Sequence, residues 1–209
     1  MSKKKSKSSS NWLKEHFNDK YVKLSLKNNL RSRSWFKLQQ IDYKYSLFKK
    51  NMNIIDLGSA PGGWSNYAIN RIGSKSKIIA CDILPMNPII GVKFIQGDLR
   101  KYSTLKSILQ SIKGKKINFI MSDISPNISG NSIIDSLKST NLCELVLKIS
   151  IKFLDKYGFI LIKSFYGTEF ESLIKKIKLI FFEVKIHKPD ASRSRSREIF
   201  ILAKNKKNN

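Results

Sequence analysis

Residues 52–64 read MNIIDLGSAPGGW, and they are the most informative segment about the fold. A short apolar strand leads into a loop with three glycines and a proline, which lets the backbone approach a ligand closely before a helix begins. The glycine spacing is neither GxGxxG nor that of a phosphate-binding P-loop, so a dinucleotide site and a nucleoside-triphosphate site both lose support. The stretch indicates the first strand, loop and helix of a nucleotide-type α/β fold.

Six further short apolar segments follow, and most are separated by helical patterns. Strands that alternate with helices predict a mostly parallel seven-stranded sheet with helices on both faces. The last two strands are joined only by a short loop, so the final strand is expected to run antiparallel at the end of the sheet. The predicted strands after the first are KIIACDI, GVKFIQGD, INFIMSD, GFILIKSF, FFEVKIHK and REIFILA.

One more helix is expected upstream of the first strand. Ser34 is its predicted N-cap, and the helix should end before Asn51. Its apolar residues recur at helical spacing, which predicts an amphipathic helix packed on the sheet. These residues are Trp35, Leu38, Ile41, Tyr45 and Phe48.

The chain is strongly basic. Forty Lys and Arg face fifteen Asp and Glu in 209 residues, and the formal net charge is +25. Hydrophobic residues make up 41%, enough for one core, so we expect a single domain at 11–203 between a disordered basic tail at 1–10 and a basic tail at 204–209. Such a charge favours RNA or DNA as partner, with anionic membranes second and codon drift toward Lys as the alternative explanation.

The two cysteines, Cys81 and Cys143, are too few for a disulfide framework and lie in no Cys/His cluster. We expect buried thiols in a reducing compartment, and no metal. No apolar run approaches a membrane span, and the start MSKKKSKSSSNW lacks the apolar stretch of a signal peptide. The expected location is the cytoplasm, without membrane contact.

Charged residues gather where the predicted parallel strands end. Ligands of open α/β sheets bind at this edge, although any single Asp could instead cap a helix or start a turn. The residues are Asp56, Asp82, Asp98, Asp123 and Lys163.

Their spacing points to a cofactor with adenosine but no phosphates. Asp82 follows Gly58 by 24 residues, close to the spacing at which an acid receives ribose hydroxyls. Asp98 and Leu99, at the next strand end, are placed to hold an adenine. S-adenosylmethionine fits this description, with further contacts expected from Asp56, Gly58, Pro61, Gly62, Gly63, Trp64 and Asp123.

Six segments, in order from Asn11 to Ala203, also carry a family resemblance: RSRSWFKLQQID, DLGSAPGGWS, CDILPMNPIIGVKFIQGDLR, MSDISPNISG, LIKSFYG and KPDASRSRSREIFI. The sequence resembles the FtsJ-type (RlmE) 2′-O-ribose methyltransferases of large-subunit ribosomal RNA. Ser59 departs from the alanine expected in many relatives, a small change that puts little in doubt.

The resemblance implies a class I S-adenosylmethionine-dependent methyltransferase (Rossmann-like) fold with strand order 3-2-1-4-5-7-6. It implies a catalytic set of Lys37, Asp123, Lys163 and Glu198. It also implies a uridine of 23S rRNA as target, within the 50S subunit. We expect a monomer.

That set suits the chemistry. A ribose hydroxyl is a poor nucleophile until its proton is drawn off, so the protein must supply positioning and a base. Burial and the Lys37 cation favour a neutral Lys163 amine, whereas Asp123 and Glu198 favour the ammonium. Lys163 as base and Lys163 as electrostatic steering group therefore both stay open.

Five of the arginines lie in two clusters beside proposed catalytic residues, which predicts two basic lips around the target nucleotide. Trp35, Phe165 and Tyr166 are candidates to stack on an unpaired base, with core packing as the alternative for Trp35 and Phe165. For Trp64 a cofactor contact is favoured and core packing is the alternative. The arginines are Arg31, Arg33, Arg193, Arg195 and Arg197.

Two other functions stay open. One is the same chemistry on another RNA, such as tRNA or an mRNA cap. The other is a non-catalytic RNA-binding assembly factor that keeps the fold, against which the intact catalytic set and glycine loop argue.

Overall fold

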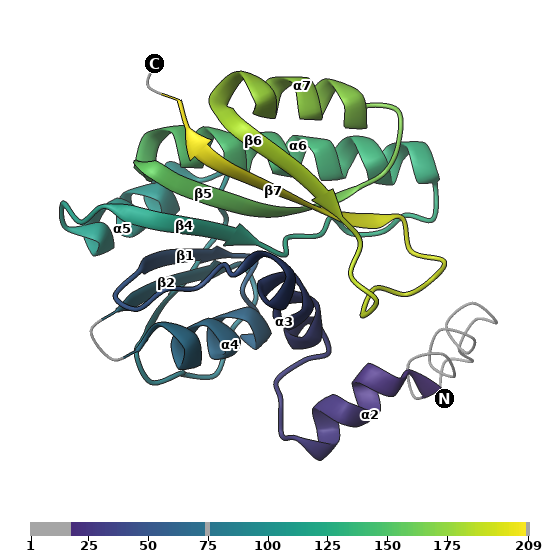
Figure 1. Ribbon diagram of the computed structural model, residues 1–209, viewed down its shortest axis with the longest axis horizontal. Helices are drawn as coiled ribbons and strands as arrows, with labels where there is room; N and C mark the ends of the chain where they lie inside the picture. The colour runs from purple at the N-terminus through teal and green to yellow at the C-terminus, as the bar shows by residue number, and fades with distance from the viewer. Residues whose placement is uncertain (1–17, 74–75, 208–209) are drawn as a thin grey trace, which may run out of the picture.

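The computed structural model describes residues 18–73 and 76–207, so the predicted tail at 1–10 lies outside the described residues. The helices are α2 (Lys20–Lys27), α3 (Ser34–Tyr45), α4 (Gly63–Ile72), α5 (Tyr102–Ile112), α6 (Ser132–Phe153) and α7 (Phe170–Ile180). The strands are β1 (Asn53–Leu57), β2 (Lys77–Asp82), β3 (Val92–Gln96), β4 (Ile117–Ser122), β5 (Leu154–Phe165), β6 (Phe181–His187) and β7 (Glu198–Lys206). They form the layered molecule of Figure 1.

The sheet has seven strands in the order β3-β2-β1-β4-β5-β7-β6, which confirms the predicted order. Strands β1 to β5 pair in parallel, and β7 pairs antiparallel with both β5 and β6. The antiparallel strand is therefore inserted between β5 and β6 instead of forming the edge. All parallel strands end on one side of the molecule, where the β6–β7 loop also lies (Figure 1).

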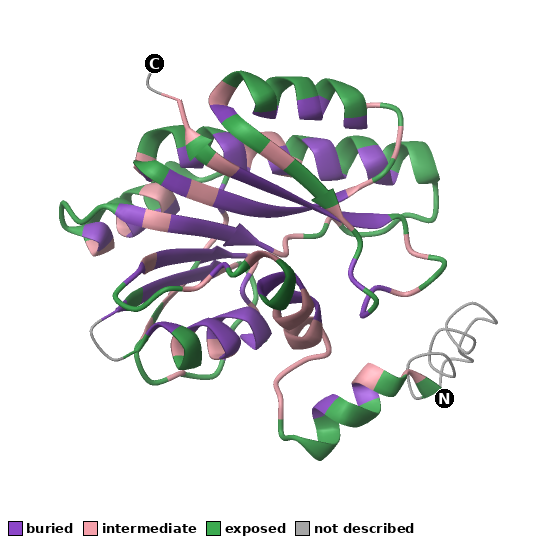
Figure 2. Ribbon diagram, viewed as in Figure 1, coloured by how far each residue is buried: buried purple, intermediate pink, exposed green. Residues whose placement is uncertain are grey.

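Two separate cores lie on the two faces of the sheet, because neighbouring strand residues point in opposite directions. Ile54 packs with the α3 and α4 side chains Leu38 and Trp64. Ile55 packs on the other face with residues of α5, α6 and α7, among them Cys143 and Leu173. Buried residues accordingly run along the central strands, and the outer helix faces are exposed (Figure 2). Burial on both faces explains the nearly continuous apolar strand sequences.

Helix α3 differs from its prediction at both ends. Arg33, not Ser34, is the N-cap, and its side chain makes no capping bond. The helix ends at Tyr45 because Ser46 takes a left-handed conformation, so Phe48 lies outside it. The buried carboxylate of Asp42 then accepts the backbone N–H groups of Leu47 and Phe48 at 2.7 and 3.3 Å, which holds the chain as it turns toward β1.

Strand β7 continues to Lys206, so the predicted tail boundary at Ala203 is wrong. The extra residues pair with β6, Lys204 opposite Glu183 and Lys206 opposite Phe181. Lys206 Nζ also donates to two backbone carbonyls at the α6–β5 junction. The extension is stable because strand pairing satisfies its backbone groups.

Helix α2 was not predicted from the sequence. Asp19 caps it through bonds from the backbone N–H groups of Tyr21 and Val22. The helix buries only Val22 and Ser25. The helix has only eight residues, fewer than the window over which helical periodicity can be recognised, which explains why the sequence gave no signal for it.

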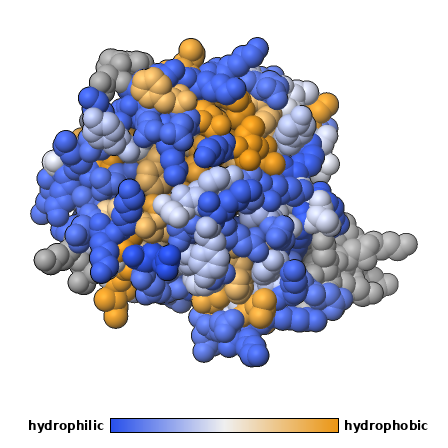
Figure 3. Space-filling model, viewed as in Figure 1, coloured by the Kyte–Doolittle hydropathy of each residue, from blue (hydrophilic) through white to orange (hydrophobic). Residues whose placement is uncertain are grey.

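The surface in the view of Figure 3 is mainly hydrophilic, interrupted by small apolar patches. This agrees with the high proportion of charged residues, 26% of the chain. Within residues 18–73 and 76–207, no helix has the length and apolar character needed to cross a membrane.

Candidate active site

The glycine loop after β1 is packed so closely that side chains would not fit. Gly58 has a φ of +73°, and a Cβ placed on it would lie 2.5 Å from the Ile124 side chain of the β4 loop. Gly62 has a φ of +104° and caps α4. The loop is thus a tight backbone surface at the carboxyl edge of the sheet, as the sequence predicted, and Pro61 is its exposed tip.

The first turn of α4 points backbone donors at this edge. Asn66 N–H closes the first helical turn on Gly62 O, so the N–H groups of Gly63, Trp64 and Ser65 have no acceptor within the helix. The Trp64 indole is different: it is 2% exposed, and its N–H donates to Ser34 O at 3.0 Å. Trp64 therefore offers a ligand its backbone, while its ring packs α3 against α4.

Asp82 joins the glycine loop to the loop after β2. One carboxylate oxygen accepts Ala60 N–H and the other Leu84 N–H, both at 2.9 Å. These bonds fix the carboxylate at the end of β2, beside the glycine loop. Its role as a ribose-binding acid stays a prediction.

Asp98 lies two residues past the end of β3 and pairs with Arg100 at 2.7 Å. Hydrogen bonds from Arg100 lower the pKa of Asp98 to about 2, so it is a carboxylate at neutral pH. Leu99 is 7% exposed and belongs to the core on the α5 side. Little of the Leu99 side chain is therefore exposed at the sheet edge for the predicted apolar contact.

Asp56 is fully buried beneath the glycine loop. Its Oδ2 accepts the Ser65 hydroxyl at 2.6 Å, whereas its Oδ1 has no partner. Burial, followed by the nearby Asp123 and Asp82 charges, raises the pKa of Asp56 to about 7 despite the Ser65 hydrogen bond. Ser59 Oγ is also buried without a hydrogen-bond partner, so Asp56 Oδ1 and Ser59 Oγ are two unpaired polar atoms under the loop.

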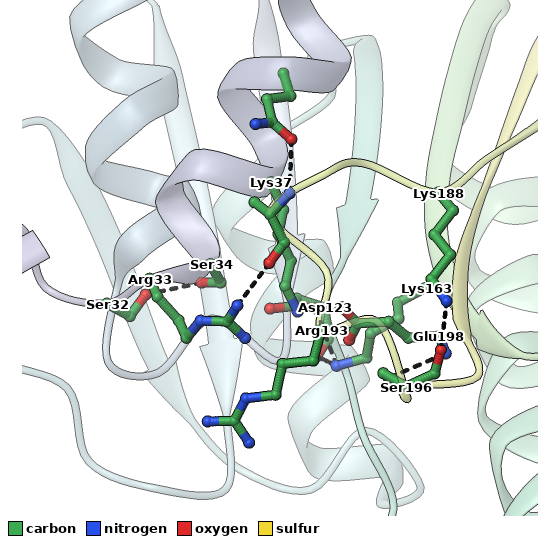
Figure 4. Close-up of polar contacts among 12 residues, drawn as sticks. Ser32, Arg33, Ser34, Lys37, Asp123, Lys163, Lys188, Arg193, Ser196 and Glu198 are labelled. Carbon is green, nitrogen blue, oxygen red and sulfur yellow. Dashed lines mark hydrogen bonds and ion pairs between the residues drawn. The ribbon is translucent and has the colours of Figure 1, made fainter. Parts of the chain in front are cut away.

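The first of two lysine–carboxylate pairs joins β5 to the end of β4. Lys163 Nζ lies 2.9 Å from Asp123 Oδ1 and donates to the Asp123 carbonyl at 2.6 Å. Lys163 is 9% exposed. Its amine is thus held at the carboxyl edge by two oxygens of one residue (Figure 4).

The second pair joins α3 to the start of β7. Lys37 Nζ lies 2.6 Å from Glu198 Oε1, and both residues are buried. Burial alone would raise the pKa of Glu198, but the Lys37 charge and hydrogen bonds from Lys37 and Ser192 outweigh it and lower the pKa. Figure 4 shows all four side chains in one group, so the structure brings the predicted set together.

Arg31 and Arg33 leave the α3 N-terminus in different directions. Arg31 donates to Pro61 O, Asn87 O and Pro88 O, and so ties the glycine loop to the loop after β2. Arg33 donates to Ala191 O at 2.7 Å in the β6–β7 loop. Arg31 therefore lies against the glycine loop, apart from Arg33, and its role in RNA binding stays a prediction.

The arginines of the β6–β7 loop also divide. Arg193 lies close to Arg33, with Asp19 between them, so the two predicted lips meet instead of flanking a gap. Arg195 is exposed, and exposed Arg197 donates to Ser132 O at the start of α6. Arg33 and the arginines of the β6–β7 loop thus form a basic surface on one side of the Lys37–Glu198 pair.

Of the three aromatic candidates for base stacking, Tyr166 is 58% exposed. Trp35 packs edge-on against Phe36 and Tyr67, and Phe165 is half-buried in β5 opposite Glu198. Tyr166 N–H donates to Arg197 O at 2.9 Å, which places it beside the basic surface. Core packing thus explains Trp35, and Tyr166 remains the candidate that faces solvent.

Sequence reasoning missed Asp19 and Asp42. Asp42 accepts the Tyr67 hydroxyl at 2.7 Å and Arg71 Nε at 3.2 Å, and so locks α3 to α4 behind the site. A capping signal was available for Asp19, since Asp precedes many helices. Nothing local indicates the ion pairs of either residue, because their partners lie far away in the sequence.

Both cysteines are buried free thiols, and burial raises the pKa of Cys81 to about 12 and of Cys143 to about 11. The prediction of buried thiols is confirmed. Among the residues that the structure describes, no group of three or more His, Cys, Asp or Glu could hold a metal ion.

Comparison with known proteins agrees with this geometry. Residues 30–206 match the family described as FtsJ-like methyltransferase. The chain is 54% identical over 200 residues to "Ribosomal RNA large subunit methyltransferase E" of Buchnera aphidicola, covering 96% of this chain and 97% of that protein.

Solved structures extend the comparison. A protein of Plasmodium falciparum described as a ribosomal RNA methyltransferase has a TM-score of 0.76 and 33% identity, over 84% of this chain and 98% of its own. Human methyltransferase-like protein 13, solved with SAH, has a TM-score of 0.52 and 14% identity, over 74% and 72%, and shares the fold. The chain belongs to the FtsJ-like methyltransferase family.

Proposed function

We propose that this enzyme transfers a methyl group from S-adenosylmethionine to the ribose 2′-hydroxyl of a uridine in 23S rRNA of the large ribosomal subunit, in the cytoplasm and as a monomer. The observation that carries the proposal is the pair of buried lysine–carboxylate contacts, Lys163–Asp123 and Lys37–Glu198, beside a glycine loop. The name of the Buchnera relative supports the choice of RNA.

The residues at the sheet edge fit this cofactor. Buried Asp56 Oδ1 and Ser59 Oγ lack partners, the α4 N-terminus offers N–H groups to a carboxylate, and Asp82 and Asp98 offer acceptors for hydroxyl and amino groups. The close packing around Gly58 and Gly62 leaves the loop backbone as the contact surface. When bound, the cofactor supplies an activated methyl group on a sulfonium.

The chain itself must position the hydroxyl and take its proton. Lys163 Nζ is held by Asp123, which fixes where the amine meets a ribose hydroxyl. An ammonium can only donate, so Lys163 must first release a proton before it acts as a base. We assign it that role, with the Lys37–Glu198 pair beside it balancing charge and orienting the ribose.

Methyl transfer is the direct test. Radiolabelled S-adenosylmethionine is incubated with 50S subunits and with free 23S rRNA, both lacking the modification, using the wild type and Lys163→Ala. The proposal predicts label on a ribose 2′-oxygen that is lost in Lys163→Ala. Cofactor binding by calorimetry without incorporation would point to another RNA, and absence of both would favour a non-catalytic assembly factor.

A further inference from the structure

Asp19 lies outside the part of the chain that matches the family, which begins at residue 30. It is the N-cap of α2, where its Oδ1 accepts the N–H groups of Tyr21 and Val22 at 2.9 and 3.3 Å. Its side chain is only 9% exposed. One carboxylate oxygen therefore holds the helix and the other is available for a different task.

That second oxygen bridges the two arginine clusters. Asp19 Oδ2 lies 3.0 Å from the Arg33 guanidinium and 3.5 Å from Arg193 Nε. The arginines come from the start of α3 and from the β6–β7 loop. Side-chain exposures of 17% for Arg33 and 18% for Arg193 show that the contact is shielded from solvent, where ion pairs are screened less.

A hydrogen-bond chain around Gln40 reinforces the same junction. Gln40 donates to the Tyr21 hydroxyl of α2 at 3.0 Å and accepts Ala191 N–H of the β6–β7 loop at 2.9 Å. Arg33 donates to Ala191 O at 2.7 Å. Three segments, α2, α3 and the loop, are thus joined at one place.

This junction lies next to the proposed reaction centre. Arg33 is one helical turn from Lys37, and Arg193 is in the loop that leads to Glu198. Figure 4 shows both arginines beside the group formed by Lys37, Asp123, Lys163 and Glu198. Without a carboxylate between them, two guanidinium groups at this spacing would repel each other.

We propose that Asp19 is a positioning residue that sets Arg33 and Arg193 side by side as a grip for the RNA backbone next to the target nucleotide. A guanidinium has five N–H donors, and Arg33 meets both Asp19 and Ala191 O through Nη2, so its Nη1 can donate to a phosphate oxygen. The inference rests on the proposed function and adds α2 to the substrate-binding surface.

The proposal is tested by removing the negative charge of Asp19 and asking whether RNA binding weakens or strengthens. Asp19→Asn removes the charge and keeps a good helix cap. The control, Asp155→Asn, removes the charge of a carboxylate elsewhere that lies 3.6 Å from the exposed Lys116. Each variant is assayed for binding to unmodified 23S rRNA and for methyl transfer, with cofactor affinity and thermal unfolding as controls.

If Asp19 positions the two arginines, Asp19→Asn should raise Kd and KM for RNA about tenfold, although the protein becomes more positive. The substitution should leave kcat and cofactor affinity unchanged. Asp155→Asn should leave RNA binding the same or slightly tighter. An Asp19→Asn variant that binds RNA as tightly as Asp155→Asn, or more tightly, would overturn the proposal, because Asp19 would then compete with phosphate or do nothing.

A double-mutant cycle supplies the second test. In an Arg33→Ala/Arg193→Ala background, Asp19→Asn should have no further effect on RNA binding. A persistent effect of the same size would show that Asp19 acts through other groups and would contradict the proposal. Failure of the wild type to methylate 23S rRNA would instead refute the proposed function.

Discussion

The carboxyl edge of the sheet has an acidic half and a basic half. The acidic half, at the ends of β1, β2 and β3, carries Asp56, Asp82 and Asp98, and the carboxylates of Asp82 and Asp98 accept backbone N–H groups close in space. The basic half, around the α3 N-terminus and the β6–β7 loop, carries arginines whose partners come from distant segments. The acids suit a cationic cofactor, and the arginines suit an RNA backbone.

The acids and the arginines are held in place by different parts of the structure, so substitutions in the two halves should have different effects. Strand ends fix the acids, so their positions follow from the sheet itself. The arginines depend on three segments meeting at Asp19 and Ala191. Substitutions of Asp82 or Asp98 should therefore act mainly on ligand affinity, whereas those in the basic half should also disturb contacts between segments.

Lys163 lies where the two halves meet, and its replacement should have the largest effect. Lys163→Arg keeps a cation but cannot accept a proton at accessible pH, so turnover should fall about 10²–10⁴-fold while cofactor and RNA affinity stay unchanged. Single-turnover rates of methyl transfer, measured as a function of pH, test whether Lys163 acts as a base.

If Lys163 acts as a base, the wild-type rate should rise with pH to a plateau. A rate that falls as Lys163 loses its proton, or an active Lys163→Arg enzyme, would show that the ammonium only steers the hydroxyl.

The buried Asp42 anchors the basic half from behind, and its loss should be the largest stability change. Asp42→Ala leaves the Tyr67 hydroxyl, Arg71 and two backbone N–H groups without their acceptor. We expect a loss of about 3 kcal/mol of unfolding free energy. Urea unfolding measures it, with Asp155→Asn as the surface control. A loss below about 1 kcal/mol would mean that α3 is held by apolar packing alone.

Much of this comparison could be predicted from the sequence, but not equally for both halves. Asp82, Asp98 and Asp123 close apolar strands, so periodicity alone placed them at one edge. The arginine junction could not be predicted, because Arg33 and Ala191 are 158 residues apart and no local pattern records their contact. Trp64 shows the same limit, since its neighbours in space, not its place next to the glycine loop, decide that the ring is buried.

Asp56 should make stability depend on pH in the acidic half. Its pKa in the folded protein, about 7, lies above the ordinary value of 3.8, so between these values the folded state holds the extra proton. Stability is then fully present below pH 4 and falls as pH rises to 7, by about 1.4 kcal/mol per pH unit. Asp56→Asn, which can still accept the Ser65 hydroxyl, should remove this slope.

Urea unfolding at pH 5, 6 and 7 measures the difference between the wild type and Asp56→Asn. The variant should gain relative stability as pH rises. Parallel curves would show that Asp56 is ionised throughout and that the acidic half carries its full charge.

Tyr166 should have the smallest effect, confined to the basic half. Stacking on an unpaired base predicts that Tyr166→Ala weakens RNA binding about tenfold, while Tyr166→Phe keeps the ring and the affinity. Tyr157, 74% exposed, is the matched control for loss of a surface tyrosine. Equal losses in Tyr166→Ala and Tyr166→Phe would mean that the hydroxyl, not the ring, meets the RNA.

The claim that the acidic half binds the cofactor and the basic half binds RNA is most directly tested by measuring both affinities in two variants, Asp82→Asn and Arg33→Ala. We expect opposite effects in the two variants: Asp82→Asn weakens S-adenosylmethionine binding and leaves 23S rRNA binding unchanged, and Arg33→Ala does the reverse. Loss of both affinities in both variants would contradict the claim, because the edge would then be one site instead of two.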